Sequence, residues 1–143
     1  VVLDKQGNLT AGTSTGGMFK KRWGRIGDSP VIGAGTYADN NSCAVSCTGH
    51  GEYFIRHAVA FDVCARYKYL KESVEKAADY IIHTELNTNA GNGGLIAVDK
   101  LGNIAMPYNS GGMFRGFLYK EKGSPEIKKG CGIGKKIVVV GEK

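Results

Sequence analysis

The chain opens with VVLDKQGNL at residues 1–9, and the same pattern returns as IAVDKLGNI at residues 96–104. Both copies then reach Gly-Gly-Met-Phe, at residues 16–19 and 111–114. Each copy predicts a strand, a turn and a second strand, because Gly and Asn tolerate the positive φ that tight hairpins need. The copies are either unrelated hairpins of a common type or neighbours in one sheet, and we favour the second interpretation.

The hydrophobic pattern gives an order of strands, two helices and strands again. Small apolar runs predict buried strands, and from Ser73 onward apolar residues recur at helical spacing in one stripe. This order predicts an α+β fold in which the helices pack on one face of a mainly antiparallel sheet. The predicted strands lie at 31–36, 43–48 and 137–140, the helices at 52–69 and from 73 onward, and a Gly-rich loop at 87–94.

The composition is that of an ordinary globular protein. With 143 residues, 42% of them hydrophobic and 22% charged, the chain is long enough for one domain with its own core. The net charge is +6, of which residues 120–143 supply +4 through seven lysines and three acids. Because aromatic residues do not alternate with these lysines, we expect a solvated basic tail and no nucleic-acid partner. No apolar run is long enough for a membrane span.

The four cysteines are Cys43, Cys47, Cys64 and Cys131, and they lack the paired CxxC motifs of a zinc site. Cys43 and Cys47 would point to the same face of one strand. We expect free, buried thiols in a reducing, cytoplasmic compartment, with two disulfides as the alternative.

Two charged residues share a loop bounded by glycine and proline. Arg25 and Asp28 lie three positions apart in GRIGDSP at residues 24–30. The guanidinium of Arg25 can form a bidentate pair of hydrogen bonds with a carboxylate, and the carboxylate of Asp28 can bind an ammonium. Together they suit a zwitterionic substrate. The alternative is a mutual salt bridge at the surface, which would add little stability.

Hydroxyls and glycines follow two of the predicted strands, as TSTGG at 13–17 and TGHGE at 48–52. Backbone N–H groups at a helix start, with a hydroxyl beside them, can stabilise the oxyanion of an acyl-transfer step. The alternatives are a Thr-rich strand edge for the first segment and a Cys47–His50 nucleophile pair for the second. The signature of a P-loop is absent, and the three histidines lack metal-ligand spacing.

Taken in order, these segments closely resemble the β subunit of the plant-type asparaginases, also called isoaspartyl aminopeptidases, which have the glycosylasparaginases as near relatives. The resemblance runs from residue 1 to about Leu118 and is weaker in the basic tail from about residue 119. The segments that carry it are LDKQGNL at 3–9, GTSTGGM at 12–18, GRIGDSPVIGAG at 24–35, TGHGE at 48–52, GGLI at 93–96, MPYN at 106–109 and GMFR at 112–115.

This resemblance implies the αββα four-layer sandwich of the N-terminal-nucleophile hydrolases, with residues 1–143 as the C-terminal, β-subunit half of a single hydrolase domain. Members are made as one precursor that cleaves itself, so the implied partner is an α subunit, in a dimer of αβ heterodimers. The family pattern places a threonine nucleophile about four positions before Val1. The chain starts without Met, a basic leader or a signal peptide, so we expect a terminus made by cleavage or residues ahead of Val1.

The resemblance also implies hydrolysis of L-asparagine and of β-aspartyl peptides without a cofactor. A bound alkali ion is a habit of the family, but no residue of this chain is assigned as a metal ligand. A free terminal threonine supplies both the nucleophile and the base, because a neutral α-amine can take the proton of the hydroxyl. The implied catalytic residues are Thr15, which orients the nucleophile, and Thr48 and Gly49, whose hydroxyl and N–H form the oxyanion hole.

The implied substrate-binding residues are Arg25 for the α-carboxylate, Asp28 for the α-ammonium, and Gly51, whose carbonyl assists Asp28. One departure concerns the substrate, since FKK at residues 19–21 stands where many asparaginases have Thr-Asn-Lys and looks more like a glycosylasparaginase. Two alternatives therefore stay open. One is hydrolysis of glycan-linked asparagine, and the other is an inactive homologue that acts as a binding protein.

Overall fold

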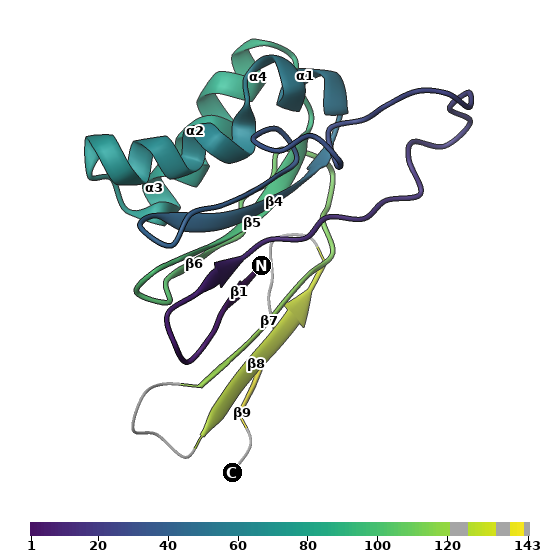
Figure 1. Cartoon of the computed structure of the whole chain (residues 1–143). Coiled ribbons are helices and arrows are strands. Elements are labelled where there is room, and N and C mark those ends of the chain that lie inside the picture. Colours follow the sequence, from purple (N-terminus) through teal and green to yellow (C-terminus); the bar gives the residue numbers. More distant parts are fainter. Residues whose placement is uncertain (121–125, 134–137, 142–143) are drawn as a thin grey trace. The chain divides into compact units, whose positions relative to one another are not determined.

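The computed structural model describes residues 1–120, 126–133 and 138–141 of the chain (Figure 1). The chain divides into two compact units, Val1–Asn109 and Ser110–Lys143. Every residue that the sequence singled out for chemistry lies in the first unit.

The first unit is built on an antiparallel sheet with strand order β3-β4-β5-β6. The two central strands pair along their whole length, from Cys43 opposite Asp99 to Gly49 opposite Gly93. The mainly antiparallel sheet predicted from the sequence is therefore confirmed. The strands are β3 (Thr36–Ala38), β4 (Cys43–Gly49), β5 (Gly93–Asp99) and β6 (Ile104–Ala105).

Strand β4 is buried on both faces, because its alternate residues enter two different hydrophobic clusters. Cys43, Val45 and Cys47 join the cluster beneath the helices. Ala44 points the other way and packs in a second cluster with Leu9. The alternation follows from the period of two in a strand, and it confirms that Cys43 and Cys47 share a face.

The helices cover one face of this sheet, as predicted (Figure 1). The apolar stripe after Ser73 consists of Val74, Ala77, Ala78, Ile81 and Ile82, which have no exposed surface. The Ser73 hydroxyl caps this helix by accepting the Lys76 N–H at 3.3 Å. The helical elements are α1 (Gly51–Arg56), α2 (Val59–Ala65), the π-helix η1 (Arg66–Leu70), α3 (Val74–Tyr80), the π-helix η2 (Ile81–Glu85) and α4 (Leu86–Thr88).

The single helix predicted over 52–69 is wrong, because the chain breaks it between α1 and α2. Ala58 has a φ of 46°, in the left-handed region, so the α-helical hydrogen bonds cannot continue past it. Further on, α4 occupies part of the loop predicted at 87–94. In the parts of the chain that the structure describes, no helix has the length and apolar character needed to span a membrane.

The two copies of the repeat form turns with the same hydrogen bonds. In the first copy, Asp4 Oδ1 accepts the Asn8 N–H at 2.7 Å and Asp4 Oδ2 accepts the Asn8 side-chain amide at 2.8 Å. In the second, Asp99 and Asn103 make the same contacts at 2.9 Å and 2.8 Å. The glycine before each asparagine has a positive φ, 87° in the first copy and 89° in the second. The prediction of two hairpins is confirmed.

The hairpins do not lie side by side in one sheet, which corrects our favoured interpretation. β1 (Val2–Leu3) and β2 (Leu9–Thr10) form a separate two-stranded sheet, whereas β5 and β6 belong to the four-stranded one. Leu9 packs with Ala44 and Val98 on the sheet face opposite the helices. The first hairpin thus adds a layer to the unit instead of widening its sheet.

The strand predicted at 31–36 is also wrong. This segment is a compact turn, in which the N–H groups of Ala34 and Gly35 both donate to the Val31 carbonyl, at 3.0 Å and 3.2 Å. Gly33 has a φ of 91° there, which favours glycine over residues with a side chain. The apolar residues of this segment therefore form a turn and not a strand, and the strand β3 begins only at Thr36.

The second unit is a three-stranded antiparallel sheet with the order β7-β8-β9. Its strands are β7 (Arg115–Lys120), β8 (Ile127–Gly132) and β9 (Val138–Gly141). The last strand, predicted over 137–140, is confirmed for 138–140, and Ile137 lies outside the described residues. The sequence did not predict β7 or β8.

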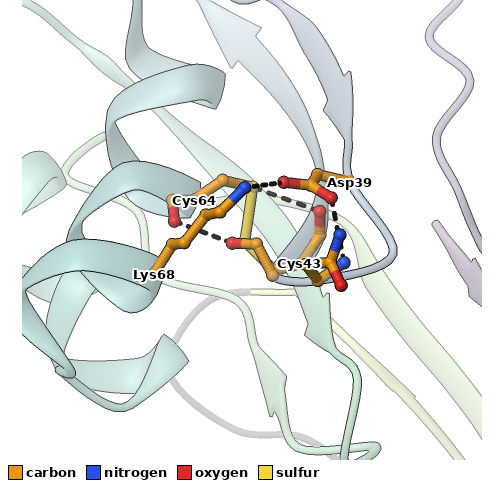
Figure 2. The surroundings of a disulfide bond; sticks show 6 residues. Asp39, Cys43, Cys64 and Lys68 are labelled. Carbon is orange, nitrogen blue, oxygen red and sulfur yellow. Dashed lines mark hydrogen bonds and ion pairs between the residues drawn. A yellow bond between two sulfur atoms is a disulfide. The ribbon is translucent and has the colours of Figure 1, made fainter.

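A disulfide between Cys43 and Cys64 joins β4 to α2 (Figure 2). Our expectation of free thiols is therefore wrong for these two residues, whose Cα atoms lie 5.5 Å apart. Cys47 is free and buried, and Cys131 is free and exposed. Next to the bridge, Lys68 donates to Asp39 at 2.8 Å, which ties the turn before β4 to η1.

Candidate active site

Asp28 is a buried carboxylate, and one of its two oxygens has no hydrogen-bond donor among the described residues. The residue is 6% exposed, and the oxygen that lacks a donor among the described residues is Oδ2. Burial raises the pKa of Asp28, and the backbone amides of Asp28 and Ser29 and the charge of Arg25 only partly offset this effect. A buried carboxylate without a full set of donors can gain greatly from a cationic ligand.

Two glycines make room for this carboxylate. A Cβ built on Gly51 would lie 2.7 Å from Asp28 Oδ1, and one built on Gly35 would lie 2.9 Å from Oδ2. Real Cβ atoms essentially never come so close to another heavy atom. Asp28 therefore sits between the turn before β3 and the first residue of α1, in a space that only glycine leaves open on both sides.

Thr48 and Gly49 end the central strand β4 and are both exposed. Gly49 pairs with Gly93 of β5, and the φ angles of the two residues are 145° and 157°. A Cβ on Gly49 would collide with the Asn92 carbonyl and would lie 2.6 Å from the Gly93 Cα. Two glycine backbones therefore approach each other closely beside Thr48.

The TSTGG segment at residues 13–17 contacts β4 and the turn beside Asp28 through Thr13. The Thr13 hydroxyl lies 2.7 Å from the Ser46 hydroxyl of β4 and donates to the Gly35 carbonyl at 3.1 Å. It thereby connects the segment after β2 both to β4 and to the glycine beside Asp28. Thr15, two residues on, is exposed, and its hydroxyl accepts the Gly17 N–H at 2.9 Å.

The structure thus brings together some of the sequence-predicted residues more firmly than others. Asp28 and Gly51 are in direct contact, and Gly51 follows two residues after Gly49. Arg25 is exposed and is linked to Asp28 only through its charge. The hydrogen bond recorded for Thr15 is local, so its role as an orienting residue stays a prediction.

The sequence reasoning missed residues that shape this site without carrying its chemistry. The sequence indicates Gly35 and Thr13 only as parts of motifs, and Asn92 only as part of the loop predicted at 87–94. The Asn92 carbonyl accepts the His50 N–H at 2.8 Å and so fixes the backbone just after Gly49. No local pattern signals such contacts, because the partners lie far apart in the sequence.

Cysteine catalysis by Cys47 is not supported. Burial raises the pKa of the Cys47 thiol well above its ordinary value, and the nearby charge of Asp28 raises it further. The thiol therefore stays protonated near neutral pH, whereas the thiolate is the nucleophile. Among residues 1–120, 126–133 and 138–141, no three His, Cys, Asp or Glu side chains gather in a way that could hold a metal ion.

Comparison with known proteins places this chain in a family. The family model described as asparaginase matches residues 1–127. The chain therefore belongs to the asparaginase family. It is 53% identical over 119 residues to an isoaspartyl peptidase of Salmonella typhimurium, and 48% identical over 133 residues to an isoaspartyl peptidase of Escherichia coli. It is 52% identical over 116 residues to a protein of Arabidopsis thaliana named as a probable isoaspartyl peptidase/L-asparaginase.

These alignments include most of this chain but less than half of each relative. They cover 83%, 86% and 81% of the chain for the three proteins. The chain spans 38% of the Salmonella protein, 41% of the Escherichia coli protein and 35% of the Arabidopsis protein.

Proposed function

We propose that the protein hydrolyses L-asparagine to L-aspartate and ammonia and removes β-aspartyl residues from peptides. The observation that carries this proposal is the contact of the buried Asp28 carboxylate with Gly51, two residues after Thr48-Gly49. A site for an ammonium group thus lies beside exposed donors for an oxyanion. The names of the Salmonella and Escherichia coli relatives support the peptide activity, and the name of the Arabidopsis relative supports both activities.

Substrate recognition in this proposal rests on charge. The α-ammonium of the aspartyl group binds the Asp28 carboxylate, whose Oδ2 accepts no hydrogen bond from the described residues. The Gly51 carbonyl accepts a second hydrogen bond from the same ammonium. Arg25 forks onto the α-carboxylate, and because it is exposed it can reach the substrate from the solvent side.

The reaction in this proposal is acyl transfer to a threonine. By the family pattern, this threonine lies about four positions before Val1, and its own α-amine takes the proton of its hydroxyl. The hydroxyl oxygen attacks the side-chain carbonyl, and the Thr48 hydroxyl and the Gly49 N–H stabilise the oxyanion. The C–N bond then breaks, ammonia or the peptide amine leaves with a proton, and water hydrolyses the ester. Thr15 orients the nucleophile.

The assembly in this proposal contains more than the present chain. An α subunit from the same precursor completes an αββα sandwich, and two αβ heterodimers associate. Two observations support it. The chain spans 38% and 41% of two relatives, and its first unit already supplies a helical layer, a sheet and a hairpin on the opposite sheet face.

The decisive experiment combines intact mass, N-terminal sequencing and activity on the purified protein. We expect a chain that begins with threonine about four residues before Val1, an accompanying α chain, and hydrolysis of L-asparagine and of a β-aspartyl dipeptide. Turnover of glycosylated asparagine alone would replace this proposal with the glycosylasparaginase alternative. A protein without that threonine and without activity on any of the three substrates would favour the inactive homologue.

A further inference from the structure

Asn109 holds the loop before β5 with both ends of its side-chain amide. Its Oδ1 accepts the Gly93 N–H at 2.8 Å. Its Nδ2 donates to the carbonyls of Gly91 at 2.9 Å and Ile82 at 3.2 Å. Its backbone N–H also donates to the Gly93 carbonyl at 2.9 Å. One side chain thus connects the loop at Gly91 and Gly93 to Ile82 of η2.

The clamped loop in turn determines where the end of β4 lies. Gly93 pairs with Gly49, and a Cβ on Gly93 would collide with the Thr48 carbonyl and would lie 2.8 Å from the Gly49 Cα. The Asn92 carbonyl accepts the His50 N–H at 2.8 Å. A shift of residues 91–93 would therefore move the backbone at residues 48–50.

The end of the sheet at Gly49 and Gly93 has no side chains of its own, and the buried Phe54 ring packs against both glycines. Both members of the closest pair are glycines, and glycine has the widest choice of backbone conformations. Their φ angles of 145° and 157° would be strained for other residues, so the sequence cannot replace them with larger, better anchored side chains. Hydrogen bonds from outside the pair add restraint, and Asn109 makes two of them with Gly93, through its Oδ1 and its backbone N–H, while its Nδ2 holds Gly91 and Ile82.

We propose that Asn109 is a positioning residue that sets the geometry of Thr48 and Gly49 through Gly93 and Asn92. This inference rests on the proposed function, because it assumes that Thr48 and Gly49 stabilise an oxyanion. It assigns a role to the last residue of the MPYN segment, which touches neither substrate group in the proposed site. Since an oxyanion develops only in the transition state, losing the clamp should lower kcat and leave KM almost unchanged.

The test compares Asn109→Ala with the matched control Asn103→Ala in the full protein. Asn103 also uses a side-chain amide on β5, since it donates to Asp99 at 2.8 Å, but it does so at the end of the strand far from Gly93. We expect Asn109→Ala to lower kcat for L-asparagine by about 10–100-fold with little change in KM. Asn103→Ala should keep kcat, even where it lowers the thermal midpoint as much.

A second readout is independent of activity. Amide hydrogen exchange at His50 and Gly93 should be faster in Asn109→Ala than in the wild type, and unchanged in Asn103→Ala. The isosteric Asn109→Asp keeps the acceptor for the Gly93 N–H and loses the donor to Gly91 and Ile82. It should therefore retain protection at Gly93 better than Asn109→Ala. This isosteric variant provides a second test in case Asn109→Ala does not fold.

The outcomes separate this inference from the proposed function. Wild-type kcat and wild-type exchange in Asn109→Ala would overturn the inference, even in a fully active enzyme. An equal loss of kcat in both asparagine variants would also overturn it, because it would show a general effect of instability. If the wild-type protein hydrolyses none of the substrates, the proposed function fails, and the exchange data alone decide whether Asn109 holds the end of β4.

Discussion

The Asp28 carboxylate lies so close to the Gly51 Cα that a Cβ there would stand 2.7 Å from Oδ1. One residue supplies the charge of the candidate site, and the other supplies the space for it. The pair joins the loop after Gly27 to the first residue of α1, so the carboxylate is positioned by the helical layer and not by its own loop alone.

Gly51→Ala should therefore displace the carboxylate. We expect KM for L-asparagine to rise by about 10-fold or more, and the unfolding free energy to fall by about 1–3 kcal/mol because the added methyl group is overpacked. Gly12→Ala is the control, since a Cβ on Gly12 would have open space around it. Steady-state kinetics and thermal unfolding of the two variants check the prediction, and similar KM values for both would contradict it.

Asp28→Asn should separate binding from stability. Burial raises the folded-state pKa of Asp28 above its ordinary value of 3.8, so the folded protein holds this proton more tightly than the unfolded chain. The unfolding free energy of the wild type consequently falls as pH rises through the interval between the two pKa values. The amide that replaces the carboxylate does not titrate, so the variant should gain stability relative to the wild type as pH rises above the ordinary pKa of 3.8 and through the raised pKa of the folded protein.

The same variant should lose activity, because the neutral amide cannot pair with an ammonium. We expect kcat/KM for L-asparagine to fall by about 100-fold or more. Thermal midpoints measured across the pH range, together with kinetics near neutral pH, test both parts. A stability difference that does not change with pH would show that Asp28 does not titrate abnormally.

Thr48→Val removes one proposed oxyanion donor with little change in shape. We expect kcat to fall by about 10²–10³-fold and KM to stay close to the wild-type value. Thr10→Val, at an exposed position of β2, is the matched control and should keep full activity. Wild-type turnover by the Thr48 variant would assign this threonine to the strand end and remove it from the reaction.

The disulfide predicts how the cysteines of this chain react. Alkylation of the denatured, unreduced chain should modify Cys47 and Cys131 only, and prior reduction should expose Cys43 and Cys64 as well. Peptide mass spectrometry reads out each site. Because the bridge closes a loop with a sequence separation of 21, we expect Cys43→Ala with Cys64→Ala to cost about 3 kcal/mol of stability. Four reactive thiols without reductant would contradict the bridge.

Local features of the fold were predictable from the sequence, and features that depend on distant residues were not. The turns at Asp4 and Asp99 and the helix capped by Ser73 are fixed by side chains a few residues away, so the pattern reveals them. The break at Ala58 has no such signal, because alanine is the best helix former. Just after the break, the N–H groups of Ala60 and Phe61 donate to the distant carbonyls of Ala34 and Gly33.

The candidate site divides in the same way. Asp28 and Gly51 could be singled out from their motifs, but their contact could not, since it spans two elements that only the folded chain brings together. The role of Asn109 is harder still to predict from the sequence, because its partners Ile82 and Gly91 lie in the helical layer and in the loop before β5. A sequence shows which residues have suitable chemistry, and the packing decides which of them meet.

The twin turns have a consequence for how the chain begins to fold. Each is sealed by hydrogen bonds between an aspartate and the asparagine four positions later, so closing it restricts only a very short loop. The pairing of β4 with β5 joins residues about fifty positions apart and is entropically far more costly. We therefore expect the hairpins to form first, as two local nuclei from which the long-range sheet is assembled.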